Sequence, residues 1–194
     1  MLLLSNKYDC KLPYSSRLLT KIKRLLFILS IKSCGSYLNI IVQTPSMHRG
    51  VIALFGEETQ VSIIPFVNNK ESLSVANCNL KPVHNYFYPA AGQPHKNHLN
   101  LLGAWELLGE QGYFPSLLLT IDECQFPLLS KKIEFLKNNC NLKILNVGFV
   151  NEGKVRDLFF ESKNIIFPSF AESFGLPLVD AVTYKKPIIA SELD

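Results

Sequence analysis

The 194-residue sequence lacks several features that would define its class at once. It has no run of about 18 apolar residues, which excludes a helix that spans a membrane. Its five cysteines are odd in number and form no C-x-x-C pair, so neither a disulfide framework nor a zinc site is expected. Scattered cysteines are typical of a reducing cytoplasm, where we expect buried thiols that act as small apolar groups.

The composition that remains is ordinary for a globular protein, with 47% hydrophobic and 19% charged residues. It suits one domain of usual size with an incomplete neighbour. The formal net charge of +4 suits a phosphate-bearing ligand or an anionic membrane surface. We expect a cytoplasmic protein with no nucleic-acid partner. Residues 25–31 begin too far from Met1, and end at Lys32 without a cleavage site, to be a signal peptide.

Residues 18–33 have the composition of a helix and carry a cluster of basic residues. Two interpretations are open for this basic segment. It is either a contact with the inner face of an anionic membrane or the solvated face of a helix that packs on a core. The basic residues are Lys21, Lys23, Arg24 and Lys32.

Apolar patterning predicts strands that alternate with helices, and the alternation is clearest after residue 83. Such alternation indicates a parallel, Rossmann-like sheet. We expect strands at 39–43, 61–66, 85–89, 116–121 and 142–147. We expect helices at 18–33, 96–110, 128–138 and 153–161, with Trp105 in the core. The weakly patterned residues 68–82 are interpreted as a linker.

The segment 164–194, NIIFPSFAESFGLPLVDAVTYKKPIIASELD, is the most informative part of the chain. An apolar run ends at Pro168, and a short loop with one acid, Glu172, follows. Gly175 then opens an apolar segment with a second acid, Asp180, before another apolar run at 188–190. This pattern predicts a strand–helix–strand unit with both acids near its ligand-binding end, because ligands bind beyond the carboxyl ends of parallel strands.

Residues 168–177, PSFAESFGLP, closely resemble the nucleotide-sugar site of retaining GT-B glycosyltransferases of the group 1 type. Those enzymes carry a Glu-x7-Glu motif, and here Glu172 is followed after seven residues by Asp180, an acid one methylene shorter. Residues 88–97, YPAAGQPHKN, resemble the loop after the first strand of the donor domain, which ends in a lysine at a helix start. Residues 40–47, IIVQTPSM, resemble the end of the acceptor domain.

The resemblance implies a Rossmann-like donor domain that is preceded by a remnant of an acceptor domain. The expected divisions are residues 1–67 for the remnant, 68–82 for the linker and 83–194 for a nucleotide-sugar-binding domain that is incomplete at its C-terminus. The chain therefore looks like a fragment or a truncated reading frame. We expect a chain of this extent not to transfer sugar by itself.

The resemblance also implies roles for the three charged residues of the motifs. Lys96 would offset the charge of the departing diphosphate, although the arginine that the family has five residues earlier is Ala91 here. Glu172 would accept hydrogen bonds from the hydroxyls of the donor sugar, and Asp180 would hold the ribose. The structural alternatives are a solvated lysine, a loop acid that caps the next helix and a helix-face carboxylate.

Backbone N–H groups around Gly175 would contact sugar and phosphate, with plain turn chemistry as the alternative. They belong to Ser173, Phe174, Gly175 and Leu176. His95 and His98 flank Lys96 and Asn97, but two histidines without an acid or thiol cluster are more typical of surface or helix-start positions than of a metal site. We therefore expect no metal.

The expected activity is transfer of a hexose from a nucleotide diphosphate sugar to an acceptor hydroxyl with retention. The expected setting is the synthesis of polysaccharide, lipopolysaccharide or glycolipid, with a saccharide or lipid-linked acceptor and no cofactor. A non-catalytic nucleotide-sugar-binding fragment or a decayed remnant is the alternative. A Rossmann-like epimerase or dehydrogenase would need G-x-G-x-x-G after the first strand, and residues 90–94, AAGQP, do not supply it.

Overall fold

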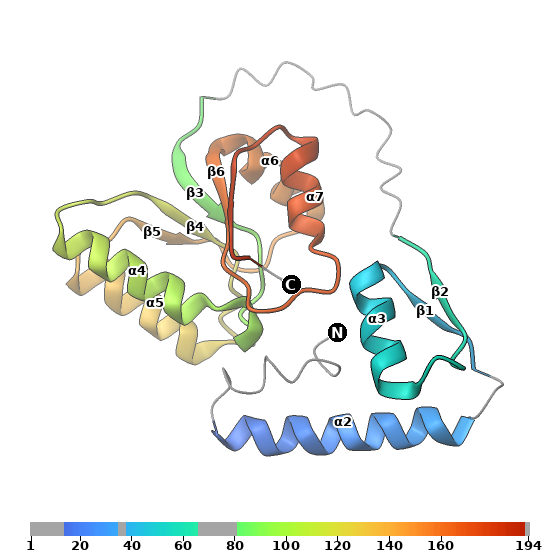
Figure 1. Cartoon of the computed structure of the whole chain (residues 1–194). Helices are drawn as coiled ribbons and strands as arrows, with labels where there is room; N and C mark the ends of the chain where they lie inside the picture. The colour runs from blue at the N-terminus through green and yellow to red at the C-terminus, as the bar shows by residue number, and fades with distance from the viewer. Residues whose placement is uncertain (1–13, 35–37, 66–80, 193–194) are drawn as a thin grey trace. The chain divides into compact units, whose positions relative to one another are not determined.

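The computed structural model of the chain describes residues 14–34, 38–65 and 81–192 (Figure 1). Its contacts divide the chain into two compact units. The first holds residues 1–73 together with 171–174 and 193–194, and the second holds 74–170 and 175–192. Most of the predicted linker, residues 68–82, lies outside the described residues. The boundaries of the three predicted divisions stay a prediction.

In the residues that the structure describes, the first unit pairs two short parallel strands with two helices. Thr44 ends the first strand segment and caps the second helix, since its hydroxyl oxygen accepts from the Met47 N–H at 3.2 Å and Pro45 fills the first helical position. The elements are α2 (Tyr14–Cys34), β1 (Ile40–Val42), α3 (Pro45–Phe55) and β2 (Val61–Ile63).

The second unit is a parallel sheet of five strands in the order β5-β4-β3-β6-β7. The strands are β3 (His84–Tyr88), β4 (Leu117–Leu119), β5 (Ile144–Asn146), β6 (Ser162–Phe167) and β7 (Ile188–Ala190). The helices are η2 (Pro94–Lys96), α4 (His98–Glu110), α5 (Pro127–Asn139), α6 (Glu152–Glu161) and α7 (Leu176–Thr183). This is the α/β fold with a parallel sheet that the sequence predicts.

Two apolar layers cover the two faces of this sheet. Helices α4 and α5 pack on one face, where Trp105 is buried and donates its indole N–H to the Pro115 carbonyl at 2.9 Å (Figure 1). Helices α6 and α7 pack on the other face, around Phe87, Phe159 and Ala181. Side chains alternate between these faces along each strand, so the β strands are apolar on both sides, as in other covered parallel sheets.

Two details differ from the sequence predictions. Lys96 does not begin α4, because a short 3₁₀ turn ends at Lys96 and a left-handed residue, Asn97, separates it from the helix. The cysteines that the structure describes, Cys34, Cys124 and Cys140, are free and exposed, so the prediction of buried thiols is wrong for them. None of the helices in the described ranges is both long and apolar enough to cross a membrane.

Candidate functional site

The order of the strands defines one special position at the carboxyl edge of the sheet. From β3 the chain moves outward through β4 and β5, then returns to place β6 on the opposite side of β3. The connections that leave β3 and β6 therefore turn toward opposite faces. Between two such neighbouring strands the loops separate and leave room for a ligand, which is where open α/β sheets bind theirs.

The loop after β3 is fixed by a close contact at Gly92 and by a turn between Pro94 and Asn97. A Cβ on Gly92 would lie 2.5 Å from Cγ of Phe126, so only glycine allows the loop that begins α5 to come so close. Pro94 then starts the 3₁₀ turn, and Asn97 ends it with φ of +62°, a conformation that asparagine adopts more readily than most residues. The Asn97 N–H donates to the Pro94 carbonyl at 3.1 Å.

Hydrogen bonds fasten this loop to the loop after β6. The Asn97 side-chain amide donates to the Pro168 carbonyl at 2.9 Å, and the Phe170 N–H donates to the His95 carbonyl at 2.8 Å. The hydroxyl of buried Tyr88 donates to the Lys96 carbonyl at 2.8 Å and lies 2.9 Å from the Ser169 hydroxyl. Because the phenolic hydrogen is used on Lys96, Ser169 is the donor of that second bond. Both motif loops therefore form one hydrogen-bonded layer.

Phe167, the last residue of β6, contacts two of the predicted phosphate-binding elements. The Lys96 ammonium lies 5.6 Å from the centre of the Phe167 ring, a cation–π distance. A Cβ on Gly175 would lie 3.9 Å from the tip of the same ring. The fold thus brings Lys96 and Gly175, which are 79 positions apart in the sequence, to the same side chain at the carboxyl edge.

Gly175 begins α7 with φ of +77° and ψ of 51°, in the left-handed region. Leu176 follows as the first helical residue and is exposed, and Pro177 takes the second position, where it removes a backbone N–H. The Leu178 N–H donates back to the Gly175 carbonyl at 2.8 Å. The glycine is therefore needed to turn the chain from the loop into the helix.

We expect Gly175→Ala to lower the free energy of unfolding by about 1–2 kcal/mol, because L-residues are strained in this conformation. The added Cβ would also lie 3.2 Å from Leu178 Cδ1. Urea unfolding followed by the fluorescence of the single tryptophan would measure the change. Gly103→Ala is the matched control, since Gly103 lies inside α4 with nothing near its Cβ position, and the change there should stabilise by about 0.5–1 kcal/mol. A shift in the same direction for both variants would contradict the assignment.

The remaining predicted site residues are divided between the two units. Residues 171–174, which include Glu172, Ser173 and Phe174, group with the first unit, although they lie in the chain between Phe170 and Gly175 of the second unit. Glu172 and Phe174 are half-buried, and Ser173 is exposed. Asp180 lies on α7 and is half-buried, one turn beyond the helix start. The second unit therefore brings Lys96 and Gly175 to one ring, that of Phe167, while Leu176 and Asp180 follow Gly175 on α7.

His98 is the first residue of α4, which is one of the two kinds of position expected for it, but it is buried and not at the surface. Its ring lies 4.8 Å from the Tyr88 ring, and neither ring nitrogen makes a hydrogen bond of good geometry within the described residues. Burial lowers the pKa of His98 from 6.5 to about 4, and the nearby Lys96 ammonium adds to this effect, while the Ala90 backbone opposes it. The ring is therefore neutral at physiological pH.

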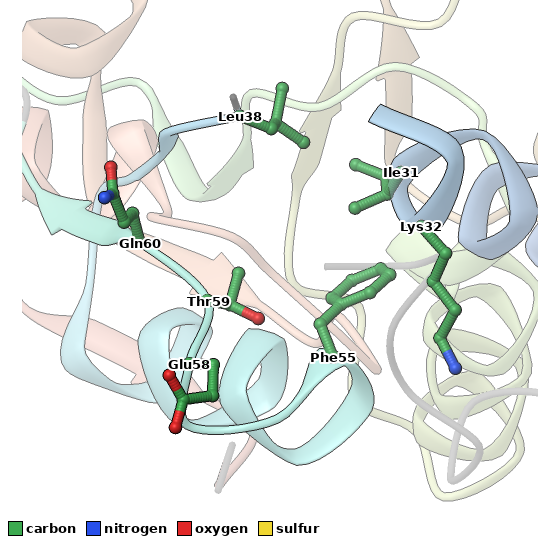
Figure 2. Close-up of a pocket in the computed structure, with 7 residues that line it drawn as sticks. All are labelled: Ile31, Lys32, Leu38, Phe55, Glu58, Thr59 and Gln60. Carbon is green, nitrogen blue, oxygen red and sulfur yellow. The ribbon is translucent and has the colours of Figure 1, made fainter. Parts of the chain in front are cut away.

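The described residues contain no group of three or more His, Cys, Asp or Glu side chains that could hold a metal ion. Two hollows in the surface lie elsewhere, and neither is lined by a predicted site residue. One, of about 470 Å³, is an apolar recess on the α4 side of the sheet near Tyr86, Trp105 and Ile189. The other, of about 290 Å³, belongs to the first unit and lies between the end of α2 and the turn that follows α3 (Figure 2). The geometry of the strands marks the candidate site.

Three residues that hold the site together were missed at the level of sequence. Tyr88, Asn97 and Ser169 all lie within the two motif segments, but they were not singled out. For Asn97 a local signal exists, since an asparagine between a proline turn and a helix is typical of a left-handed residue. The hydrogen bond between Tyr88 and Ser169 joins residues that are 81 positions apart, and no local sequence pattern predicts it.

The fold and the site define a doubly wound α/β protein with a ligand edge at the β3–β6 switch point. The model of the family described as glycosyl transferases group 1 matches residues 83–194. The chain therefore belongs to this family of glycosyltransferases, and the predicted enzyme class is confirmed. The match covers the second unit from its first strand onward.

Curated relatives and solved structures agree with this family. The serotype-specific mannosyltransferase WbdA of Escherichia coli is 29% identical over 112 residues, which are 52% of this chain and 12% of WbdA. A glycosyltransferase from Rickettsia africae matches with a TM-score of 0.66 and 20% identity, over 80% of this chain and 44% of that one. Anabaena HepE, solved with UDP and glucose, matches with a TM-score of 0.57 and 18% identity, over 97% and 50%. The chain thus spans half or less of each relative's length, and the structural matches show a shared GT-B fold.

Proposed function

We propose that this chain contributes the donor half of a retaining GT-B glycosyltransferase. The reaction would move a hexose from a nucleotide diphosphate sugar to an acceptor hydroxyl in the synthesis of a polysaccharide, lipopolysaccharide or glycolipid. The observation that carries the proposal is the hydrogen-bonded layer of the two motif loops at the β3–β6 switch point. The mannosyltransferase relative and the UDP- and glucose-bound HepE structure support a nucleotide-sugar donor.

Each predicted residue has a task in this proposal. Lys96 would offset the negative charge that develops on the diphosphate leaving group. Glu172 would accept hydrogen bonds from two sugar hydroxyls, and Asp180 would do the same for the ribose hydroxyls. The backbone N–H groups of Ser173, Phe174, Gly175 and Leu176 would approach sugar and phosphate at the start of α7. No cofactor beyond the donor substrate is required, and the acceptor hydroxyl would attack from the face that the leaving group departs.

We expect Lys96→Ala to weaken the binding of a nucleoside diphosphate by about 1.5–3 kcal/mol, the usual contribution of a hydrogen bond to a charged group. Binding of the nucleoside without phosphates should be nearly unchanged. Isothermal titration calorimetry of UDP against uridine, and of GDP against guanosine, would measure both. Lys131→Ala is the matched control, because Lys131 is an exposed lysine on α5 away from both motif loops. An equal loss for nucleoside and diphosphate would make Lys96 a structural residue.

A non-catalytic nucleotide-sugar-binding module is the second candidate. It is favoured by Ala91, which stands where the resemblance leads us to expect an arginine that binds phosphate. The two candidates differ in turnover and not in donor binding. Mass spectrometry of an enzyme that joins this donor domain to an acceptor domain, supplied with nucleotide sugars and saccharide acceptors, would decide between them, since sustained donor-dependent product is possible only for the enzyme.

The same proposal includes the setting of the enzyme. The acceptor would be a saccharide or a lipid-linked saccharide, and the protein would act in the cytoplasm. Peripheral contact with the inner face of a membrane would be made through the basic segment between Lys21 and Lys32.

A further inference from the structure

Helix α2 presents an apolar face that its own unit leaves exposed. Six aliphatic side chains recur at the three- and four-residue spacing of one helix face, and we refer to them as the leucine stripe. The stripe consists of Leu18, Leu19, Ile22, Leu25, Leu26 and Leu29. Their exposed fractions run from 47% at Ile22 to 65% at Leu18. Single exposed leucines are common on protein surfaces, but six on one face form a contiguous apolar patch.

A different face of α2 packs against the rest of the first unit. Arg24, Ile28 and Ile31 are half-buried and follow one another at the same helical spacing. Ile31 points toward Phe55 of α3 across the hollow that Figure 2 shows. The leucine stripe is therefore not the face through which α2 joins its unit. This speaks against the interpretation of a helix whose apolar side is packed on a core.

Positive charge borders the leucine stripe on both sides. Lys21 lies three residues after Leu18 and four before Leu25, which places it along one edge. Lys23 lies four residues after Leu19 and three before Leu26, which places it along the other. Lys32, eleven residues after Lys21, extends the first edge by three turns. All three lysines are exposed.

The sequence around these lysines is free of acids up to the end of α3, after which Glu58 lines the hollow of Figure 2 together with Lys32. Residues 11–56 contain seven Lys and Arg residues and no Asp or Glu. An apolar groove on a protein partner could cover the leucine stripe, but it would not require positive charge along both edges of the stripe. A bilayer that contains anionic phospholipids supplies both an apolar interior and a negative surface, and it matches the whole face of the helix.

We propose that α2 is an interfacial helix that lies flat on a bilayer of anionic phospholipid. The leucine stripe enters the boundary between headgroups and acyl chains, and the ammonium groups of Lys21, Lys23 and Lys32 reach the lipid phosphates on their flexible stems. This inference deepens the proposed function and rests on it only for the cytoplasmic setting. Lipid binding and nucleotide binding are measured separately, so one can fail while the other stands.

The test is flotation of the full chain with two kinds of vesicle. The wild-type protein should float with vesicles of phosphatidylcholine and phosphatidylglycerol in equal parts and stay behind with pure phosphatidylcholine. The triple variant Lys21→Gln, Lys23→Gln, Lys32→Gln should bind the anionic vesicles about 100-fold more weakly, since each cation near the surface contributes about fivefold. Leu25→Glu should also abolish binding, because it places a charge in the middle of the stripe.

The matched control removes the same charge from the second unit. The triple variant Lys131→Gln, Lys143→Gln, Lys163→Gln replaces three exposed lysines there and should bind anionic vesicles as the wild type does. If both triple variants weakened vesicle binding equally, net charge alone would explain the binding, and the proposal would be overturned. Equal binding to both vesicle types, or to neither, would overturn it as well. A dimer in light scattering that Leu25→Glu dissociates, without vesicle binding, would identify a second copy of the chain as the occupant instead.

Discussion

Glu172→Ala is expected to lower kcat/KM by at least ~100-fold, or ~2.7 kcal/mol of transition-state stabilisation. The reason is that a carboxylate which orients the donor sugar acts on the reacting ring, where its hydrogen bonds strengthen as the bond to the leaving group breaks. The change would be measured in an enzyme that joins this donor domain to an acceptor domain. Binding of the bare nucleoside diphosphate should hardly change, because that ligand has no sugar for Glu172 to hold.

The comparison between the two ligands makes this prediction specific. A structural role for Glu172, such as capping α7, would weaken nucleotide and nucleotide sugar by the same factor, and that outcome would end the assignment. Glu134→Ala serves as the control, since Glu134 is exposed on α5 and pairs with Lys137 at 3.7 Å in the same helix. Such a surface pair contributes little, so activity and donor binding should both be retained.

His98 is expected to make the folded state less stable in acid by up to about 3 kcal/mol. Above pH 6.5 the ring is neutral in both the folded and the unfolded chain, so it contributes no pH dependence. As the pH falls below 6.5 the unfolded chain takes up a proton, while the folded chain does not do so until about pH 4. Stability is therefore lost between these two values, and the deficit is constant below the lower one.

The measurement is urea unfolding across this range for the wild type and His98→Phe. Phenylalanine keeps a ring against Tyr88, and it has no proton to gain, so the variant should lack the part of the acid loss that His98 causes. Other groups titrate in the same window in both proteins, and the difference between the two curves isolates His98. If the free energy of unfolding fell by the same amount in both proteins from pH 7 to pH 4, the pKa of His98 would not be lowered in the folded state.

The sequence predicted the sheet and its motif loops because their signals are local. Apolar runs of strand length, the prolines at the starts of α3, α5 and α7 and the glycine at 175 are each readable within a few residues. The break between Lys96 and α4 was not predicted, since Asn97 takes its left-handed form while its side chain bonds Pro168, 71 positions away. The burial of His98 was missed for the same reason, because the ring that lies against it belongs to the preceding strand.

One chain of hydrogen bonds links the ends of three strands in series. Ser191, just after β7, donates to the Ser169 carbonyl at 2.5 Å, the Ser169 hydroxyl reaches Tyr88, and Tyr88 holds the Lys96 carbonyl. Each bond in this chain positions the next. A change that restrains the backbone at Lys96 therefore also restrains the backbone at Ser191, and the two effects are coupled. Thermodynamic linkage is reciprocal. A diphosphate that immobilises Lys96 would slow the opening of the backbone after β7, and whatever structure secures that backbone would in turn tighten the diphosphate site from the far edge of the sheet.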